Sequence, residues 1–224
     1  DIIMLDDSLN VHSTWLGGKL VVKDKKITSL LDDQLSKQRY KYPLKAYQTV
    51  ILPKQISYLP QIPNKNLFKI NAIKTELPGI MTFQEQIQIN KKLNSWHEIL
   101  ETHNLCHICV IERHNKNGEF AHGFIKNFNL KEGAVASSVG HDAHNIIVAG
   151  LNEEDMQFAV NRIKETQGGI VIVDNQKLIA EVKLPIAGLL SDKKASEVAV
   201  ENETFKKSWI DAGCSLPYMG FNLL

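Results

Sequence analysis

The sequence predicts an α+β fold, built mainly from antiparallel strands with two clear helices late in the chain. Short apolar runs of strand length recur between turn signals. Apolar residues at helical spacing form two clear patterns, and both follow residue 150. A TIM barrel needs eight strand–helix units over about 250 residues. We therefore expect no TIM barrel in this chain.

The first part of the chain predicts two short regions before the main domain. Residues 1–22 read as strand, turn and strand, with the Gly17-Gly18 pair before the second apolar run. Residues 23–45 are rich in lysine and favour a solvated connector, and the four prolines within residues 42–63 exclude long helices there, so residues 23–63 are expected to connect two regions. The main α+β domain is expected to cover residues 64–224.

Four strand regions are predicted in the main domain before its first clear helix. Residues 66–74 read as a strand entering the domain. Residues 105–114 form the next, and alternation directs its odd-numbered side chains to one face and its even-numbered side chains to the other. The Asn117-Gly118 pair predicts a hairpin turn into a returning strand at 120–128. Residues 133–150 then contain two apolar runs with a polar segment between them.

The two predicted helices have recognisable ends. Asn152 is a suitable N-cap, the acids after it favour a helix N-terminus, and Gly168-Gly169 should stop the helix. Its buried stripe consists of Met156, Ala159, Val160 and Ile163. A hairpin of residues 169–173 and 178–182 follows. The last helix is expected to start at Ser191 or Asp192 and to end at Gly213, with one face formed by Val198, Phe205 and Trp209.

Composition limits the classes of partner. The 224 residues carry a formal net charge of +1, so no bulk field attracts the chain to nucleic acid or to an anionic membrane. No apolar run approaches the roughly 18 residues of a membrane span. The N-terminus does not resemble a signal peptide, and three cysteines suit a reducing compartment. We expect a cytoplasmic protein without nucleic-acid or membrane partners.

The polar segment from Gly140 to Asn145 is the first candidate functional site. His141, Asp142, His144 and Asn145 supply more ionisable and hydrogen-bonding capacity than a surface turn requires. Loops held between rigid strands often carry functional residues. The alternative is a tight loop whose imidazoles satisfy local backbone groups.

Three other chemistries are weakly supported. His141 and His144 could join His114, His122 or Asp142 at a zinc ion, although their spacing does not demand it. Ser137 or Ser138 with His141 and Asp142 provides the residue types of a triad, but they lie too close along one loop. Cys106 and Cys109 form a Cys-x-x-Cys pair within a strand, where the two thiols should point to opposite faces. We therefore expect no metal site in this chain.

Three motifs in order carry a family resemblance. They are Ala136-Ser-Ser-Val-Gly-His-Asp-Ala-His-Asn145, Asn152-Glu-Glu-Asp-Met-Gln-Phe-Ala-Val-Asn-Arg162 and Leu184-Pro-Ile-Ala-Gly-Leu-Leu-Ser-Asp192. Together they resemble the C-terminal domain of bacterial adenine deaminases, members of the amidohydrolase superfamily. The resemblance is dense from about Leu105 to Asp192 and weaker on either side.

The resemblance implies a metal-dependent hydrolysis of adenine to hypoxanthine and ammonia. In this superfamily a barrel with a His-x-His motif holds the metal, and this sequence contains no His-x-His. The implied cofactor, a divalent manganese, iron or zinc ion, is therefore expected in a barrel outside this chain. Residues 1–22 resemble the returning strands of the β-sandwich that follows the barrel. The implied partners are adenine, the protein's own N-terminal barrel and further copies in a homo-oligomer.

The resemblance also implies which residues line the active site. A Val-Ile-Glu-Arg-His run at this place in the family suggests that one of Glu112, Arg113 and His114 faces the site. Residues 184–188 match as well, and we interpret them as a strand exit with a rigid turn. The full set of candidate lining residues is His141, Asp142, His144, Asn145, Ser137, Ser138, Glu112, Arg113 and His114.

This sequence departs from the family pattern at a few positions. Asn104 stands where the family usually has aspartate, and Asn127 and Asn129 stand where glycines are common around Phe128. Asparagine tolerates positive φ, so these loops should be preserved. The family usually continues past Leu224, so a last strand or tail is expected to be missing.

Three functions follow from these observations. The first is an auxiliary domain that closes or lines the mouth of the barrel in an adenine deaminase, and that is inactive when isolated. The second is a structural or oligomerisation module without a catalytic contribution. The third is a free-standing metal hydrolase centred on His141 and His144.

Overall fold

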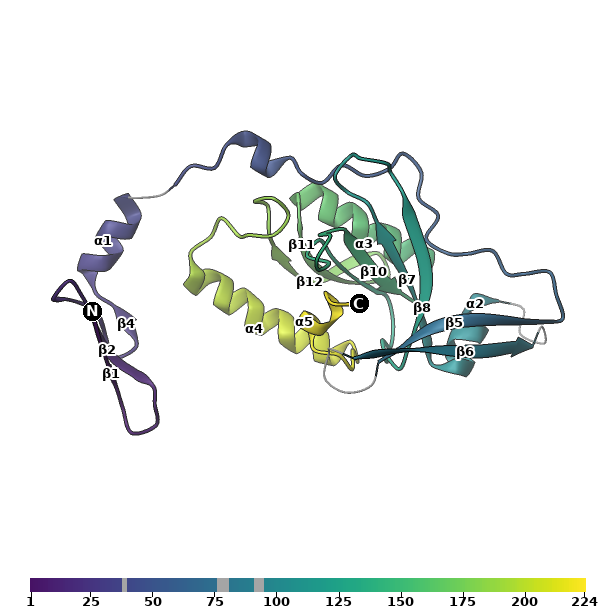
Figure 1. Ribbon diagram of the computed structural model, residues 1–224, viewed down its shortest axis with the longest axis horizontal. Coiled ribbons are helices and arrows are strands. Elements are labelled where there is room, and N and C mark those ends of the chain that lie inside the picture. The colour runs from purple at the N-terminus through teal and green to yellow at the C-terminus, as the bar shows by residue number, and fades with distance from the viewer. Residues whose placement is uncertain (38–39, 76–80, 91–94) are drawn as a thin grey trace. The chain divides into compact units, whose positions relative to one another are not determined.

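The computed structural model describes residues 1–37, 40–75, 81–90 and 95–224 (Figure 1). They form two compact units, Asp1–Tyr42 and Pro43–Leu224, which we describe separately. No helix among these described residues is long and apolar enough to cross a membrane.

The first unit is a small antiparallel sheet followed by one helix. The strands pair in chain order as β1 (Ile2–Leu5), β2 (Val11–Leu16), β3 (Lys19–Lys23) and β4 (Lys26–Ile27), and α1 spans Ser29–Lys37. Gly17 and Gly18 have φ values of 52° and 74° in the turn between β2 and β3. All four side chains of β1 are apolar and exposed. β4 and α1 lie inside the predicted connector, and the predicted boundaries at residues 22 and 63 stay predictions.

The second unit is organised around one eight-stranded sheet with the order β12-β11-β9-β10-β7-β8-β5-β6. Its strands are β5 (Leu67–Thr75), β6 (Thr82–Asn90), β7 (Leu105–Ile111), β8 (Phe120–Lys126), β9 (Ala134–Ser137), β10 (Ile146–Gly150), β11 (Gly169–Asp174) and β12 (Lys177–Lys183). Every pairing is antiparallel except that of β5 with β8. The predicted α+β class is confirmed.

Helices cover both faces of this sheet (Figure 1). α3 (Glu153–Thr166) packs on one face and α4 (Ala195–Asp211) packs on the other. The alternation predicted for β7 is confirmed, because Cys106 lies in the cluster under α4 and Cys109 lies in the cluster under α3. Both thiols are buried and free, and burial raises the pKa of each to about 12.

The predicted ends of the two helices agree only in part with the ends in the structure. Asn152 caps α3 as predicted, with its side-chain oxygen accepting the Asp155 N–H at 2.8 Å. The left-handed residue that ends α3 is Gln167, with φ 59°, immediately before the glycines. The predicted start of α4 at Ser191 or Asp192 was wrong. Ser191 instead accepts the Lys193 N–H in a turn, and the helix begins at Ala195.

The three asparagines at the positions of departure form one cluster. Asn104, Asn127 and Asn129 have φ values of 52°, 63° and 61°, so the expectation that asparagine preserves these loops is confirmed. The Asn104 amide donates to Asn127 Oδ1 at 3.3 Å and to Asn129 Oδ1 at 2.9 Å. The asparagines therefore tie the start of β7 to the chain that follows β8.

Several elements of the second unit were not predicted. β6 carries a polar residue at every second position, and α2 (Trp96–His103) has only eight residues. α2 is capped by Ser95, whose hydroxyl accepts the Glu98 N–H at 3.2 Å. Ile99 and Leu100 of α2 pack with buried residues of β5 and β6 in a third apolar cluster. A short terminal helix, α5 (Tyr218–Phe221), also follows α4.

An extended arm crosses the second unit before β5. It begins with the short 3-10 helix η1 (Leu44–Tyr47), after which Val50 and Tyr58 are buried against the cluster under α3. The Val50 N–H donates to Gln167 Oε1 at 3.1 Å, and the Ile51 N–H donates to the Arg113 carbonyl at 3.0 Å. The arm is therefore fixed to the sheet on the side where β7 ends.

Candidate functional site

The polar loop Gly140–Asn145 lies between two fully buried central strands. β9 and β10 pair antiparallel, and they also pair with β11 and β7 on their outer sides. The His144 N–H donates to the Gly140 carbonyl at 2.6 Å and closes the loop. A Cβ at Gly140 would lie 2.6 Å from the Asn145 carbonyl oxygen, so only glycine fits there. The backbone of the loop is consequently well defined.

Ser137 and Ser138 lie beneath the loop, and both are fully buried. The Ser138 hydroxyl donates to the Gly188 carbonyl at 2.6 Å and accepts the Gly169 N–H at 2.9 Å. The Ser137 hydroxyl accepts the Val139 N–H at 3.1 Å. These hydroxyls bind backbone groups and have the geometry of structural serines rather than of a nucleophile beside His141.

Arg113 is the centre of the buried layer, with 1% of its surface exposed. Its Nε–H donates to the His144 carbonyl at 2.6 Å. One terminal nitrogen donates to the Thr49 carbonyl and hydroxyl, both at 3.2 Å, and the other donates to the Ala187 carbonyl at 3.0 Å. Burial lowers the pKa of Arg113, and the nearby Glu112 carboxylate opposes this effect. The guanidinium thus joins the loop, the arm and the turn after β12.

The turn at residues 184–188 supports this guanidinium directly. Gly188 has φ 72°, and a Cβ there would lie 2.8 Å from three guanidinium atoms of Arg113. Ala187 also has a left-handed φ of 57°, and its N–H donates to the Ala46 carbonyl at 2.6 Å. Residues 184–188, which were predicted to form a rigid turn, therefore pack directly against the Arg113 guanidinium.

Glu112 and His114 point in different directions from Arg113. The Glu112 carboxylate accepts the N–H groups of His114, Lys116 and Gly118, the last two at 3.1 and 3.2 Å. Burial acts to raise the pKa of Glu112, but these hydrogen bonds outweigh it, and the pKa is lowered. Glu112 therefore holds the hairpin between β7 and β8. The exposed His114 ring donates through Nε2 to the Ala143 carbonyl at 3.1 Å and so contacts the polar loop.

The outer side of the loop carries the remaining candidates. The side chains of His141 and Asp142 are 55% and 88% exposed, and Nδ1 of the ring lies against the Asp142 carboxylate as an ion-pair contact. His144 and Asn145 are half-buried. The rings of His141 and His144 meet edge to face, with their centroids 5.9 Å apart. The structure therefore brings these four side chains together at one surface.

A hydrogen bond fixes the tautomer of the His144 ring. A carbonyl oxygen can only accept, so His144 Nδ1, 3.0 Å from the Val139 carbonyl, carries the proton. In the neutral ring Nε2 is then an acceptor, and no hydrogen bond from the described residues reaches it. The loop can offer this acceptor nitrogen to a ligand, beside the exposed His141 ring.

The described residues contain no group of three or more His, Cys, Asp or Glu side chains that could hold a metal ion. The ring of His122, one candidate for such a site, hydrogen-bonds the Ser57 carbonyl at 2.7 Å. Nδ1 of His141 is already paired with the Asp142 carboxylate, and Nδ1 of His144 is bonded to the Val139 carbonyl.

Several residues of the site gave no signal in the sequence. Thr49 lies 64 positions before Arg113, within a segment interpreted as a connector. The Asn222 carbonyl accepts the His141 N–H at 2.7 Å, although Asn222 follows the last predicted element. Contacts between such distant segments cannot be read from local patterns. Gly188 was part of a recognised motif, but its contact with Arg113 could not be anticipated.

Comparisons with protein families and with curated proteins all match adenine deaminases. The family model described as "Adenine deaminase C-terminal domain" matches residues 79–224. Adenine deaminase 2 of Bradyrhizobium sp. (strain ORS 278) is 56% identical over 225 residues, and adenine deaminase of Chelativorans sp. (strain BNC1) is 53% identical over 225 residues. Adenine deaminase of Clostridium botulinum (strain Loch Maree / Type A3) is 34% identical over 233 residues.

These matches cover 100% of this chain but 37% of the length of each of the three relatives. The family model covers more than half of the chain, including all of the polar loop and the segments around it. The chain therefore belongs to the adenine deaminase C-terminal domain family.

Proposed function

We propose that this chain is the C-terminal part of an adenine deaminase, a cytoplasmic enzyme that hydrolyses adenine to hypoxanthine and ammonia. The names of relatives that match the whole chain at 50–56% identity support the proposal. The share of 37% in those relatives leaves room for a catalytic barrel in the remainder of the protein. Adenine is the proposed substrate of that whole protein.

We place the catalytic metal, a divalent manganese, iron or zinc ion, in that barrel. The described residues do not fit such an ion, because they contain no cluster of three metal donors. We therefore derive no step of the reaction through a metal in this domain. We expect the 224-residue chain alone to have no deaminase activity.

We propose that the polar loop lines or closes the mouth of the barrel. The observation that supports this role is the His144 ring, whose fixed tautomer leaves Nε2 as an acceptor, beside the exposed His141 ring. The His144 Nε2 can accept a hydrogen bond from the exocyclic amine of adenine, and the Asn145 carboxamide can pair with a ring nitrogen. Groups fixed before the substrate arrives stabilise a transition state most effectively.

The first unit supports an attachment to further strands. Each side chain of β1 is apolar and exposed, with Ile2 at 64% and Ile3 at 62%. Apolar strands of this kind need a cover. We propose that residues 1–22 are returning strands of the β-sandwich beside the barrel, that residues 23–63 connect them to the domain, and that residues 64–224 form that domain.

A structural or oligomerisation module is the alternative function. The buried hydrogen bonds of Arg113 and Ser138 favour it, because they explain the recognised motifs by stability alone. This alternative predicts that changes at His141, His144 and Asn145 affect folding or assembly and leave turnover unchanged.

Alanine variants of the loop in the whole enzyme distinguish the two functions. We expect the residue nearest the purine, among His141, His144 and Asn145, to lose about 10²-fold in kcat/KM, the scale of one lost preorganised donor or acceptor. Metal content and melting temperature should stay close to wild type. Lower stability with normal turnover per folded molecule in all three variants would support the structural module instead.

A further inference from the structure

The two edges of the eight-stranded sheet differ in their protection against pairing with another chain. β12, at one edge, carries Lys177, Glu181 and Lys183, and its register with β11 shifts near Ile172. Charged side chains and bulges are the usual means by which an edge strand avoids association. This edge is therefore protected.

β6, at the other edge, has fewer of these features. It pairs with β5 in nine consecutive positions without a register shift, and it contains neither proline nor a basic residue. Its one charged residue, Glu85, is bound to Lys126 and lies 3.9 Å from Lys74. In the described part of the chain, no strand pairs with the outer side of β6. Its outward backbone groups are thus available to a further strand.

The side chains of β6 suit a second copy of the same strand. Five polar uncharged residues alternate along one face: Thr82, Gln84, Gln86, Gln88 and Asn90. A two-fold axis through Gln86 would oppose Gln84 to Gln88 and Thr82 to Asn90, and it would use all nine residues. On the other face Glu85 would oppose Ile87, so no like charges would meet. An axis one residue earlier would oppose Glu85 to itself.

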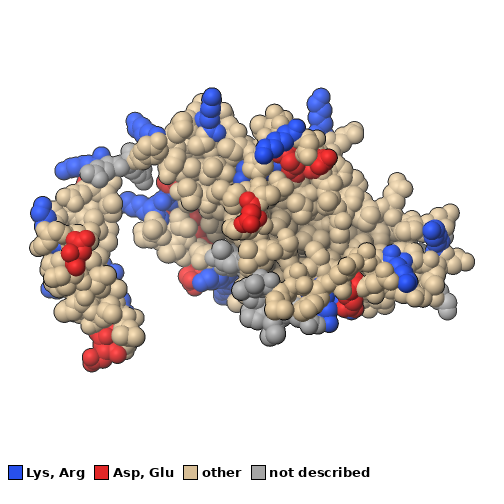
Figure 2. Space-filling view, in the orientation of Figure 1, with Lys and Arg blue, Asp and Glu red and all other residues tan. Residues whose placement is uncertain are grey.

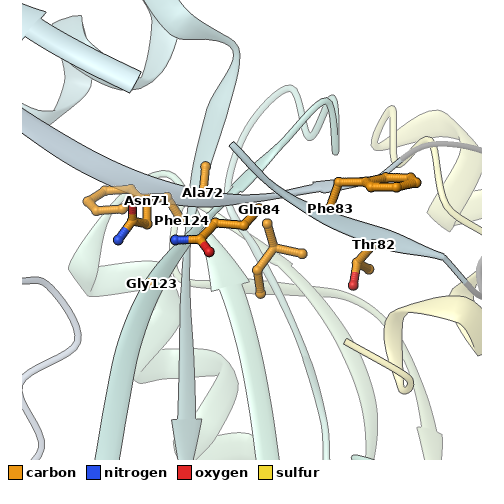
Figure 3. A pocket seen from close by; sticks show the side chains of 8 residues that line it. Asn71, Ala72, Thr82, Phe83, Gln84, Gly123 and Phe124 are labelled. Atoms are coloured by element: carbon orange, nitrogen blue, oxygen red, sulfur yellow. The ribbon is translucent and has the colours of Figure 1, made fainter. Parts of the chain in front are cut away.

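The surface beside this edge is also consistent with an extended sheet. A shallow hollow of about 330 Å³ lies over β5, β6 and β8, lined among others by Asn71, Gln84 and Gly123 (Figure 3). Phe83, which is 47% exposed, lies on the edge strand itself. A second β6 would continue the polar face beyond Gln84 and would shield Phe83.

We infer that β6 pairs antiparallel with β6 of a second copy about Gln86, joining two sheets into one continuous sheet in a homodimer. The inference is independent of the proposed deaminase function. Backbone hydrogen bonds from the outward-facing half of the β6 residues would provide the attraction, and the neutral side-chain pairs would set the register.

Cysteine scanning of β6 tests both the partner and the register. Residues opposite each other in an antiparallel pair have Cα atoms about 4.5–5.5 Å apart, within reach of a disulfide. Gln86→Cys should therefore form a covalent dimer under mild oxidation. Gln84→Cys should not, because its two copies would lie about 13 Å apart along the strands. Mixing Gln84→Cys with Gln88→Cys should restore the cross-link.

The chain offers good controls for this experiment. The native cysteines are buried, so wild type should not cross-link. Asn71→Cys, on the neighbouring strand β5, should remain monomeric on a denaturing gel. Gln86→Lys places two like charges opposite each other and should raise the dimer dissociation constant at least about 10-fold in sedimentation equilibrium.

A wild-type chain that sediments as a monomer at tens of micromolar overturns the inference. Equal cross-linking of Gln86→Cys and Gln84→Cys, with both variants folded by circular dichroism, also overturns it. If Gln86→Cys in the whole enzyme resists both oxidation and alkylation, its own N-terminal part covers β6, and the inference is wrong.

Discussion

Polar side chains lie on both sides of the loop Gly140–Asn145, but those on the inner side are buried, whereas His141 and Asp142 on the outer side are exposed. On the inner side, the buried Arg113 and Ser138 direct their donors to backbone carbonyls, including that of His144. On the outer side, His141 and Asp142 are exposed, and His144 keeps one ring nitrogen without a partner among the described residues. One layer fixes the backbone and we propose that the other offers groups to a ligand, so stability and activity should depend on different residues.

The buried Arg113 also differs from the charged side chains at the surface of the protein. On the face shown in Figure 2, Lys and Arg side chains are interspersed with Asp and Glu. Arg113 instead lies inside the domain, with carbonyls and a hydroxyl as its hydrogen-bond partners. A buried cation without a bonded carboxylate is costly, which indicates that the hydrogen bonds by which Arg113 joins the loop, the arm and the turn after β12 contribute substantially to stability.

The largest expected effect is the loss of Arg113. Arg113→Leu leaves the carbonyls of Thr49, His144 and Ala187 without their donors, and each buried acceptor costs about 1–3 kcal/mol. We expect the free energy of unfolding to fall by about 3–5 kcal/mol in urea titrations. Arg162→Leu is the control, because Arg162 binds Glu181 and Glu165 nearer the surface. Its loss should be about 1 kcal/mol, and equal losses would contradict the comparison.

A buried imidazole provides the next test, through pH. His107 on β7 is fully buried against Trp96 and Phe124, and no hydrogen bond from the described residues reaches its nitrogens. Burial, with repulsion from His122, lowers the pKa of His107 to about 4. The unfolded chain takes up this proton near its ordinary pKa of 6.5, so the native state loses stability as pH falls from 6.5 to 4.

The contribution of His107 to this loss is about 3 kcal/mol when complete. His107→Phe should remove that part of the pH dependence, measured as unfolding free energies at pH 7.5, 5.5 and 4. An unaltered acid slope in His107→Phe would show that other groups cause it.

The smallest expected effect is the difference in stability between two glycine-to-alanine variants, which separates backbone strain from steric conflict with Arg113. Gly188→Ala introduces a Cβ at a φ of 72° and against the Arg113 guanidinium, whereas Gly118→Ala meets only Pro53 at 3.9 Å and has a φ of 66°. Gly118→Ala should cost about 1 kcal/mol, the strain of a left-handed residue. Gly188→Ala should cost about 1 kcal/mol more, because Arg113 must move. Thermal unfolding of both variants measures the difference, and equal costs would mean that Arg113 has room to adjust.

The sequence was most informative where one pattern decided the structure. The apolar runs around Gly140–Asn145 became β9 and β10, and Asn152 capped α3 as its spacing indicated. The polar alternation of β6 was missed, because an edge strand with one exposed face has few apolar residues. The eight-residue α2 is too short for a clear periodic signal.

The arrangement of the candidate residues could not be predicted from the sequence. The local pattern drew attention to His141 and His144, and the family resemblance drew attention to Arg113, yet neither could show that the first two face outward and the third faces inward. That distinction depends on Thr49 and Ala187, which lie 64 and 74 positions from Arg113. Such contacts follow from the packing of the arm and of the turn after β12, which no local pattern encodes.

The most direct test of the account compares the inner and outer sides of the loop in one experiment. In the whole enzyme, kcat/KM for adenine and melting temperature would be measured for His141→Ala, His144→Ala, Asn145→Ala and Arg113→Lys. We predict that at least one outer variant loses about 10²-fold in kcat/KM with a nearly unchanged melting temperature. Arg113→Lys should lower the melting temperature by several degrees. Wild-type kcat/KM in all three outer variants would contradict the proposed role of the loop in catalysis.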